Sequence, residues 1–498
     1  MAKALRDLVA LLPDAKIQGE ADLLIEALAH DSRKVVPGTL FVCLTGFKTD
    51  GHQHIAEAYA QGATAVLVEK EVDHIPENLT VITVADTKKA IRMMTPHFFG
   101  YPSRKLRMIG VTGTNGKTTT TYLLKSILQE AGFKVGVIGT IQNSIGERIV
   151  PSKNTTPDVI DLQNLLTEMV ENQVDYVVME VSSHALELER VAGCEFDVGI
   201  FTNLTRDHLD FHVTFENYLS AKAKLFQSLS GEENYKKGKT AIINVDDEAA
   251  ATILQRTQCN TITYGIHADA NLKADHVNIQ STGAQFDIKS SSFGLMPLDL
   301  KITGLFNVYN VLAAVGAAFA EGIDHQVIKK TLEKFQSVPG RFELVQVGQS
   351  FSVIVDYAHT PDGLENILRT AKQIAKKKII VVFGCGGDRD RTKRPIMGKI
   401  AAEYGDIVIA TSDNPRSEDP DLILNEIEIG IKTGLTGGKI YEKITDRRQA
   451  IERALHMAEI DDIVIIAGKG HEDYQILKDR TISFDDKEVA REIIKEMI

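Results

Sequence analysis

The run LRMIGVTGTNGKTTT, at residues 106–120, contains the pattern that decides the fold of this chain. Residues 106–111 form an apolar stretch typical of a buried strand, and a helical pattern follows at residues 117–130. Between them, Gly113 and Gly116 allow the tight turn that joins a strand to a helix. Backbone N–H groups at such a helix start can bind phosphate oxygens, so the run predicts a phosphate-binding loop.

The residue types in this loop favour a nucleoside triphosphate. Lys117 would pair with the β- and γ-phosphates, and the Thr118 hydroxyl would bind Mg²⁺. Val111 stands where the common form of the motif has its first glycine, so the loop is a variant with shortened spacing. A purely structural strand–turn–helix corner is the alternative interpretation. We expect ATP to be held here by Gly113, Thr114, Asn115, Gly116, Lys117, Thr118 and Thr119.

Strand-like runs alternate with helical patterns along the rest of the chain. The predicted strands lie at residues 40–44, 65–68, 176–181, 198–202, 240–245, 351–355, 378–383, 406–410 and 463–467. Such alternation predicts mostly parallel sheets that are covered by helices on both faces. Glycine and proline mark breaks near residues 99–103 and 336–340. We therefore predict an α/β fold of three domains, at residues 1–103, 104–336 and 337–498.

The composition is that of an ordinary soluble globular protein. Of 498 residues, 43% are hydrophobic and 25% are charged, and the net charge is −12. This acidic balance argues against a general binder of nucleic acids or anionic membranes, although it leaves room for a local basic site. The four cysteines are far apart and indicate neither a zinc site nor a disulfide framework. Because no cleavable leader or membrane-length apolar run is found, we expect a cytoplasmic protein. We also expect it to act as a monomer.

Two polar residues that follow central strands could complete a magnesium site. Glu180 lies at the end of a predicted strand, and the carboxyl edges of parallel strands face the ligand crevice. Because Mg²⁺ prefers oxygen ligands, Glu180 can add to a shell of phosphate oxygens and Thr118. His208, in the run NLTRDHLD at residues 203–210, follows the next strand. Taken alone, a histidine in such a place is more often a loop residue than a ligand.

The helical pattern at residues 218–226 places one lysine on an apolar face. The neighbours of Lys222 one turn away in either direction are large and apolar, whereas Lys224 has polar neighbours. Burying a lysine is costly unless it is paired or neutral. A neutral lysine can react with CO₂ to form a carbamate, which would provide an oxygen ligand for a second Mg²⁺. On this pattern alone, a lysine that extends to solvent or forms an ion pair is the more common outcome.

Taken in order, these motifs resemble those of the Mur ligase family, and the resemblance covers essentially the whole chain. The matching runs lie at residues 112–119, 180–184, 203–210, 222, 304–310, 356–362, 384–390, 413–416 and 468–473. The family's loop has the same shortened glycine spacing, and the family carries a carbamylated lysine at the position of Lys222. The resemblance implies an N-terminal uridine-nucleotide-binding α/β domain, a central P-loop ATPase domain and a C-terminal Rossmann-like domain that binds an amino acid.

The resemblance also implies a reaction and a set of site residues. The reaction would be ATP-dependent joining of a carboxylate to an amine through an acyl phosphate, in peptidoglycan precursor synthesis. The residues implied in catalysis are Lys117, Glu180, His208 and Lys222, and those implied at the metal are Thr118, Glu180, His208 and Lys222. The nucleotide would further contact Asn307, Arg341, Asp356 and Tyr357. The substrate UDP-N-acetylmuramoyl-L-alanyl-D-glutamate would contact Ser32, Phe47, Lys48, Asn154, Thr155, Thr156, Ser182 and Arg190.

Two C-terminal runs indicate which amino acid is added. GCGGDRD at residues 384–390 and DNPR at residues 413–416 each follow a predicted strand, so both can face one crevice. Arginine holds a carboxylate through a planar fork that lysine cannot copy, and diaminopimelate has a distal carboxylate that lysine lacks. In the resembling family, a DNPR run accompanies diaminopimelate addition. We therefore predict meso-diaminopimelate as the added substrate, with Arg416 holding its distal carboxylate. The resemblance implies that the amino-acid site also includes Arg389, Asp413, Asn414, Pro415, Gly468 and Glu472.

Several alternatives stay open at this point. Arg416 could be an ordinary surface ion-pair residue, since such pairs are common. The chain could be the same ligase adding L-lysine, or a folylpolyglutamate synthetase-type ligase. A regulatory P-loop protein is less favoured because the sequence has no NKxD-type guanine motif. A nucleic-acid-binding ATPase would need a basic face that the net charge does not favour.

Overall fold

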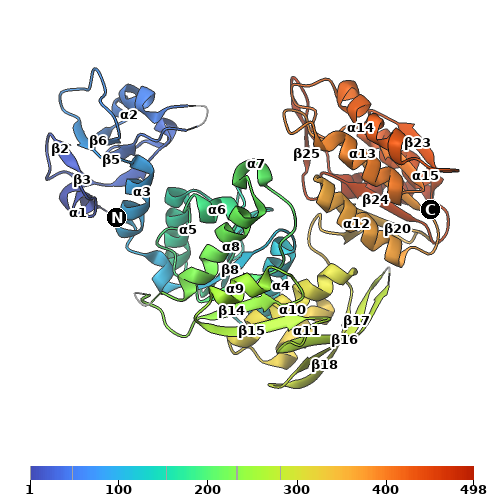
Figure 1. Ribbon diagram of the computed structural model, residues 1–498. Helices are drawn as coiled ribbons and strands as arrows, with labels where there is room; N and C mark the ends of the chain where they lie inside the picture. Colours follow the sequence, from blue (N-terminus) through green and yellow to red (C-terminus); the bar gives the residue numbers. More distant parts are fainter. Residues whose placement is uncertain (1, 47–48, 153, 232–233, 281) are drawn as a thin grey trace.

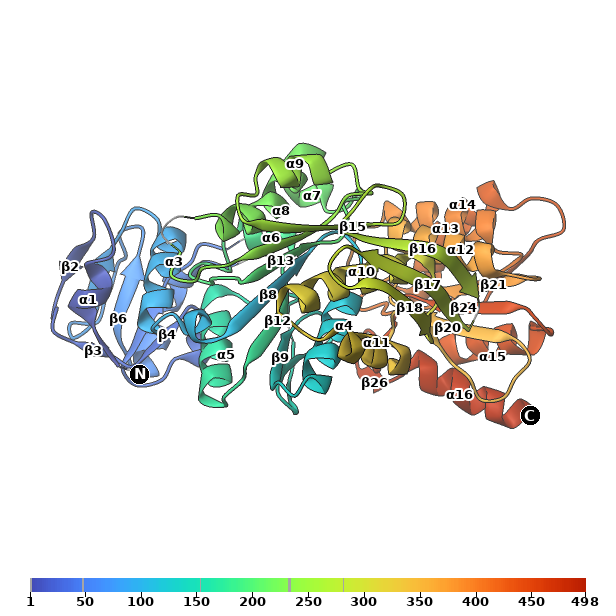
Figure 2. The ribbon, with the colours of Figure 1, turned by 90° about the horizontal axis from the view of Figure 1, so that it is seen from below.

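The structure is a computed structural model that describes residues 2–46, 49–152, 154–231, 234–280 and 282–498. Figure 1 shows three lobes in a row, coloured blue, cyan to yellow, and orange to red, with the chain ends on the two outer lobes. Figure 2, turned by 90°, shows the central sheet extending between the outer lobes. Within the described part of the chain, no helix combines the length and apolar character needed to cross a membrane.

The N-terminal lobe is a small sheet with helices on both faces. Its elements are β1 (Lys3–Ala4), α1 (Leu5–Val9), β2 (Lys16–Gln18), β3 (Leu24–Ile25), β4 (Ala27–Ala29), β5 (Thr39–Val42), α2 (Ile55–Ala60), β6 (Ala63–Val68), β7 (Thr80–Thr83) and α3 (Thr87–Phe98). The strand order is β2-β7-β6-β5-β4, parallel except for β2. Alternate residues of β6 enter two different cores, Ala65 and Leu67 on one face and Val66 and Val68 on the other.

The central lobe contains the predicted phosphate-binding loop. Its strands are β8 (Arg107–Thr112), β9 (Val135–Ile138), β10 (Asn143–Ile145), β11 (Arg148–Val150), β12 (Tyr176–Glu180), β13 (Val198–Phe201), β14 (Thr240–Asn244), β15 (Asn260–Gly265), β16 (Leu272–Gln280), β17 (Gly283–Ser290) and β18 (Gly294–Leu300). Its helices are α4 (Lys117–Glu130), α5 (Val159–Glu171), α6 (Ser183–Glu187), α7 (Leu209–His212), α8 (Phe215–Leu229), α9 (Ala250–Gln255), α10 (Leu305–Ala320) and α11 (His325–Lys334). The helix predicted at residues 117–130 is confirmed as α4.

The strand order of this lobe places the loop in the middle of the sheet. The order is β11-β10-β9-β12-β8-β13-β14-β15-β16-β17-β18, and the strands from β9 to β16 are parallel. Helices α4 and α10 cover one face, and α5, α8 and α9 cover the other. The antiparallel strands at both ends of the sheet were not predicted. In β16 buried and partly exposed residues alternate, which is typical of an antiparallel strand with one solvated face.

The C-terminal lobe is a second, largely parallel sheet between two helical layers. Its elements are β19 (Glu343–Leu344), β20 (Ser352–Asp356), α12 (Pro361–Ile374), β21 (Ile379–Phe383), α13 (Lys393–Tyr404), β22 (Ile407–Ala410), α14 (Pro420–Gly434), β23 (Ile440–Lys443), α15 (Arg447–Met457), β24 (Ile463–Ala467), β25 (Tyr474–Ile476), β26 (Thr481–Ser483) and α16 (Asp486–Met497). The order β19-β20-β24-β21-β22-β23 brings the carboxyl ends of β20, β24, β21 and β22 to one edge. The α/β architecture is thus confirmed, while the domain boundaries at residues 103 and 336 stay predictions.

Candidate active site

The loop between β8 and α4 is shaped by close contact with the end of β13. Gly113 has a φ of 148°, and a Cβ at this position would lie 1.9 Å from the Thr202 hydroxyl oxygen, so only glycine fits. The next residues are held from the same side, because Thr114 N donates to Asn203 O and Asn115 N donates to Asn203 Oδ1, both at 2.9 Å. The loop therefore has a fixed shape at the N-terminus of α4.

The loop lysine and threonine are arranged around the end of β12. Lys117 Nζ donates to the carbonyls of Gly113 (2.9 Å) and Thr114 (2.8 Å), so its cation lies over the turn. The Thr118 hydroxyl donates to Glu180 Oε2 at 3.0 Å. Glu180 is 1% exposed and also accepts two hydrogen bonds from Thr140, through its N–H and its hydroxyl. These contacts fix a carboxylate oxygen and a hydroxyl oxygen side by side at the edge of the loop.

Arg341, which lies just before the first strand of the C-terminal lobe, reaches this loop. Arg341 Nη2 lies 3.3 Å from the Thr118 hydroxyl oxygen and donates to it, while Arg341 Nε is buried and has no hydrogen-bond partner among the described residues. A buried N–H without a partner costs about 1–3 kcal/mol, so a ligand acceptor at this point would be favourable. The phosphates of a nucleotide supply such acceptors. The unsatisfied guanidinium beside a phosphate-binding loop therefore fits ATP.

The other predicted nucleotide residues lie next to these groups. Asp356 ends β20 and accepts hydrogen bonds from Phe342 N (2.7 Å) and Ala358 N (2.8 Å). Its burial raises the pKa of Asp356 to about 6. The ring of Tyr357 lies 5.0 Å from the Arg341 guanidinium carbon. Asn307, the remaining residue predicted at the nucleotide, lies in α10, where its Oδ1 accepts a hydrogen bond from Asn310 Nδ2 at 3.0 Å.

Lys222 lies on the apolar face that its helical neighbours indicated, and it does not extend to solvent, which on that pattern alone was a more common outcome. It is 1% exposed, its Nζ donates to Gly113 O at 2.8 Å, and Nζ lies 4.5 Å from the centre of the Tyr218 ring. Among the described residues, no carboxylate lies within ion-pair distance of it. Burial and the nearby Lys117 cation lower the pKa of Lys222 well below its usual value, which favours a neutral amine. Lys224 instead bonds Glu187 at the surface, at 2.7 Å.

His208 belongs to a cluster of rings beside Lys222. Its ring centre lies 4.7 Å from that of His184 and 6.1 Å from that of Tyr218, and burial lowers the pKa of His208 to about 4. The Tyr218 hydroxyl also lies 3.0 Å from the Thr114 hydroxyl, which ties the cluster to the loop. The structure thus brings Lys117, Lys222 and His208 to one edge of the central sheet.

The oxygen atoms near the loop fit magnesium only in combination with other ligands. In the part of the chain that the structure describes, no three His, Cys, Asp or Glu side chains are arranged to hold a metal ion. Thr118 and Glu180 nevertheless present two hard oxygen donors within 3.0 Å of each other. Mg²⁺ commonly takes one or two protein oxygens and completes its shell with phosphates and water. The donor set therefore fits Mg²⁺ bound together with a nucleotide.

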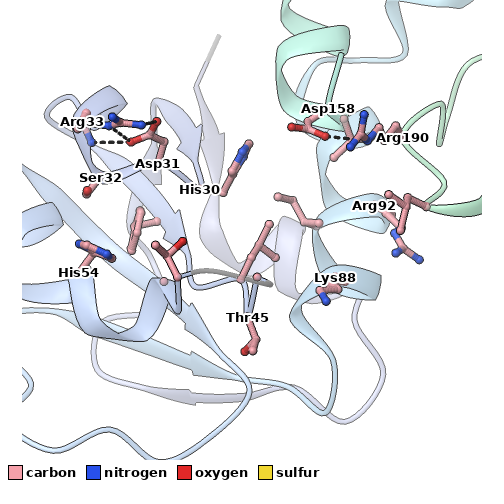
Figure 3. Close-up of a pocket in the computed structure, with 18 of the residues that line it drawn as sticks. His30, Asp31, Ser32, Arg33, Thr45, His54, Lys88, Arg92, Asp158 and Arg190 are labelled. Carbon is pink, nitrogen blue, oxygen red and sulfur yellow. Dashed lines mark hydrogen bonds and ion pairs between the residues drawn. The ribbon is translucent and has the colours of Figure 1, made fainter. Parts of the chain in front are cut away.

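A pocket of about 900 Å³ lies between the N-terminal and central lobes, and Figure 3 shows its lining. Ser32, buried at 7% exposure, lies on one side of it, with Arg33 and His54 nearby. Lys88 and Arg190 line the opposite side. Arg33 pairs with Asp31 and Arg190 with Asp158 in this lining, and Lys88 adds a further basic group that suits an anionic ligand. Two further residues predicted to contact the UDP-linked substrate, Phe47 and Lys48, lie outside the described residues.

The residues predicted for the peptide part of this substrate lie between the pocket and the loop. Thr156 donates through its hydroxyl to Glu180 O at 2.9 Å, and Ser182 N donates to that hydroxyl oxygen at 3.1 Å. Arg190 pairs with Asp158 at 2.9 Å and lines the pocket itself. The remaining two are Asn154, which is exposed, and Thr155, whose hydroxyl lies 3.0 Å from that of Thr140. Together they form a path from the pocket toward Glu180.

The predicted amino-acid residues gather at the carboxyl edge of the C-terminal sheet. Asn414 Nδ2 donates to Glu472 Oε2 at 2.8 Å, and Lys469 Nζ bonds both Glu472 (3.1 Å) and Asn414 Oδ1 (3.3 Å). Asn414 N also donates to Asp413 Oδ1, at 2.6 Å. Lys469, which is fully buried, was missed by the sequence analysis although it stands between two glycines after β24. It orients the amide and the carboxylate that would meet the ligand.

Arg416 and Arg389 both lie close to Gly386. A Cβ at Gly386 would lie 2.8 Å from Arg416 Nη1 and 3.8 Å from Arg389 Cγ. Arg416 Nη1 donates to Gly387 O at 2.8 Å, and Pro415 precedes it in the same turn. No acidic partner of Arg416 is found among the described residues, so the surface ion pair considered as an alternative is not formed.

The nucleotide loop and the arginine-bearing site are connected by direct contacts. The Tyr357 ring, next to Arg341, lies 4.8 Å from the ring of His471, which precedes Glu472. Gly468 N donates to Asp356 O at 3.0 Å. Because the contacts are continuous, a phosphorylated substrate at the loop and an amine at the C-terminal edge would approach the same space.

Comparisons with known proteins agree with this arrangement. Models of the Mur ligase family catalytic domain, the Mur ligase middle domain and the Mur ligase glutamate ligase domain match residues 24–99, 111–318 and 340–470. The UDP-N-acetylmuramoyl-L-alanyl-D-glutamate–2,6-diaminopimelate ligase of Clostridium botulinum is 48% identical over 95% of this chain and 96% of its own length. The enzyme of the same name from Syntrophomonas wolfei is 47% identical over 98% and 99%. A solved structure of such a ligase has a TM-score of 0.70 and 34% identity, covering 100% of this chain and 99% of the other.

Proposed function

The chain belongs to the Mur ligase family, and we propose that it adds meso-diaminopimelate to UDP-N-acetylmuramoyl-L-alanyl-D-glutamate in peptidoglycan precursor synthesis. The reaction is ATP-dependent, uses Mg²⁺ and forms an amide bond. Its close relatives carry this activity in their names and match it over nearly their whole length. We place the reaction in the cytoplasm, where ATP is available.

One observation carries the proposal: Arg341 of the C-terminal lobe bonds Thr118 of the nucleotide loop. This contact joins the C-terminal lobe, which also carries Arg389 and Arg416, to the loop where ATP would be held. A P-loop protein that only hydrolyses nucleotide has no need for a second site that binds a carboxylate. A ligase needs both, because the activated acid and the incoming amine must meet.

The first step activates a carboxylate. The D-glutamate side-chain carboxylate of the UDP-linked substrate attacks the γ-phosphorus of ATP, ADP leaves, and an acyl phosphate forms. Lys117 and Arg341 balance the negative charge of the phosphates, while Glu180 orients the Thr118 hydroxyl. Mg²⁺, when bound, neutralises charge on the transferring phosphoryl group.

The second step forms the amide. The amine of diaminopimelate attacks the acyl carbon, and the tetrahedral intermediate collapses with loss of phosphate. Arg416 and Arg389 hold a carboxylate of diaminopimelate, and Asn414 and Glu472 hold its polar groups near the amine. Positioning of the amine against the acyl phosphate supplies much of the rate enhancement, since oriented reactants reach high effective concentrations.

Phosphate release measured with UDP-N-acetylmuramoyl-L-alanyl-D-glutamate and ATP tests the function. We expect release to depend on an acceptor and to be fastest with meso-diaminopimelate, compared with L-lysine and L-glutamate. A matched variant, Arg416→Lys, keeps the charge but loses the fork, and should raise the KM for meso-diaminopimelate about 10- to 100-fold. Equal phosphate release without any acceptor, or faster release with lysine in the unmodified protein, would refute the proposal.

A further inference from the structure

The two arginine-bearing loops of the C-terminal lobe each lead into a helix. Residues 384–390 precede α13, and residues 413–416 precede α14. These two helices make the most extensive contact between elements in the described part of the chain. The position of each loop is therefore tied to how α13 and α14 pack.

The loops are also bonded to each other directly. The Ser417 hydroxyl donates to Asp388 Oδ1 at 2.6 Å, and Ser417 N lies 3.2 Å from Asp388 Oδ2. In return, Asp388 N donates to Glu418 Oε1 at 2.6 Å, and Gly387 N donates to Asn414 O at 2.9 Å. Because these bonds run between the two loops, a shift in one loop would move the other.

A buried arginine, Arg394, lies next to the two loops and is not among the residues predicted for the site. Arg394, in the first turn of α13, is fully buried and forms a two-pronged pair with Glu418, at 2.8 and 2.9 Å. It also donates to Glu426 on α14 at 2.8 Å, and Arg394 Nη2 lies 3.3 Å from Gly386 O. The bond with Arg394 lowers the pKa of Glu418 to about 2, so Glu418 is charged at neutral pH. Glu418 thus joins Arg394 to the backbone of the first loop.

The backbone of Arg416 needs such support. Its φ is 52°, in the left-handed region that is unfavourable for a residue other than glycine. Its Nη1 atom is turned toward Gly387 O, at 2.8 Å. The direction of its remaining N–H groups therefore depends on where residues 386–388 lie, and those residues are fixed by Glu418 and Ser417.

We infer that Arg394 and Glu418 are positioning residues that set the specificity for the distal carboxylate of the added amino acid. They act through Asp388 and Gly387 on the orientation of the Arg416 fork, and they do not touch the substrate. This inference rests on the proposed function, because it concerns how the same site recognises diaminopimelate. Displacement of a binding group by about 1 Å can cost roughly 100-fold in rate, so the loss of the ion pair between Arg394 and Glu418 should have a measurable effect.

The chain offers a matched pair of variants for the test. Glu418→Gln and Glu426→Gln each remove one carboxylate that bonds Arg394, but only Glu418 also bonds the loop at Asp388 N. For both variants and the unmodified protein, the KM and kcat are measured with meso-diaminopimelate and with L-lysine, together with the KM for ATP. We expect Glu418→Gln to raise the KM for meso-diaminopimelate about 10-fold. The preference for meso-diaminopimelate over lysine should fall by a similar factor, while kcat and the KM for ATP change less than about two-fold.

Glu426→Gln should leave all of these constants within about two-fold of the unmodified protein. Equal effects of the two variants, or a fall in kcat for both amino acids without a change in preference, would overturn the inference. If Glu418→Gln does not fold, Ser417→Ala decides, since Ser417 is exposed and its loss removes only the bond to Asp388. We expect it to raise the KM for meso-diaminopimelate about three-fold or more, and an unchanged KM overturns the inference. A lack of preference for meso-diaminopimelate in the unmodified protein would instead refute the proposed function.

Discussion

Replacing the buried lysine of α8 should separate stability from activity. In Lys222→Met, a side chain of similar length takes the place of an amine that is 1% exposed and has one hydrogen bond, to Gly113 O. That carbonyl would not be left without a donor, because Lys117 Nζ also bonds it at 2.9 Å. The substitution therefore removes a poorly satisfied polar group and leaves no new one behind.

The magnitude follows from these contacts. Burying an amine without full compensation costs about 1–3 kcal/mol, and the single hydrogen bond returns about 1 kcal/mol. We expect Lys222→Met to raise the free energy of unfolding by up to about 2 kcal/mol, which corresponds to a rise of at most roughly 4–8 °C in Tm for a domain of 150–250 residues. Ligase activity should fall about 100-fold or more, because a group beside the nucleotide loop is lost.

Thermal unfolding without ligands, in buffer depleted of CO₂, measures the first effect, and phosphate release measures the second. The matched control is Lys224→Met on the same helix, which removes a surface pair with Glu187 and should change stability by less than about 1 kcal/mol. Activity of Lys222→Ala should recover partly with added short carboxylic acids if a carbamate oxygen is the missing group. A lower Tm for Lys222→Met than for the unmodified protein would refute the reasoning about its burial.

Three further substitutions or reactions have clear expected outcomes. Gly113→Ala should abolish ATP binding in a calorimetric titration, because its Cβ would lie 1.9 Å from a hydroxyl oxygen; normal affinity would show that the loop can rearrange. Arg447→Met should lower the free energy of unfolding, measured by urea denaturation, by about 3–5 kcal/mol, because it leaves the fully buried Asp486 without its partner. The double variant that also carries Asp486→Leu should recover most of this loss. Burial raises the pKa of Cys43 and Cys385 to about 12, so their thiolates are scarce below that pH. Labelling of these two thiols by a disulfide reagent should therefore stay slow between pH 7 and 9 in the folded protein. Fast labelling at pH 8 would contradict their burial.

Much of the fold could be predicted from the sequence because its signals are local. The strand–glycine turn–helix run around Gly113 predicts α4 with its observed bounds. Apolar runs predict four strands of each larger sheet to within about a residue or two of their ends, namely β8, β12, β13 and β14, and β20, β21, β22 and β24, whereas the other strands of these sheets were not predicted. The burial of Lys222 followed from helical periodicity, since four of its neighbours along the helix are large and apolar. Patterns of this kind depend only on residues a turn apart.

The residues that were missed depend on contacts between distant parts of the chain. Met397 and Ala401 follow Arg394 one and two turns along α13, so helical periodicity places Arg394 on the buried face. The carboxylates that make its full burial possible, Glu418 and Glu426, come from a different part of the chain. Lys469 stands between glycines, where no helical or strand pattern indicates burial. It bonds Glu472, three residues along the chain, and Asn414, which comes from a distant turn. A single sequence contains no signal for such pairs, because their energy comes from desolvated ion pairs formed only after the sheets assemble.

The connection between the two halves of the active site depends on one residue, Asp356. Asp356 accepts a hydrogen bond from Phe342 N, and Phe342 has a φ of 47°, so this bond holds a strained turn just after Arg341. The backbone oxygen of Asp356 accepts from Gly468 N, at the start of the run that contains Glu472. The same residue therefore fixes the arginine that faces the phosphates and the glycine turn that leads to the amino-acid site. Because both are attached to β20, a movement of the C-terminal sheet carries the phosphate-facing arginine and the amine-binding residues together. We conclude that activation of the acid and delivery of the amine depend on a single placement of this sheet against the nucleotide loop.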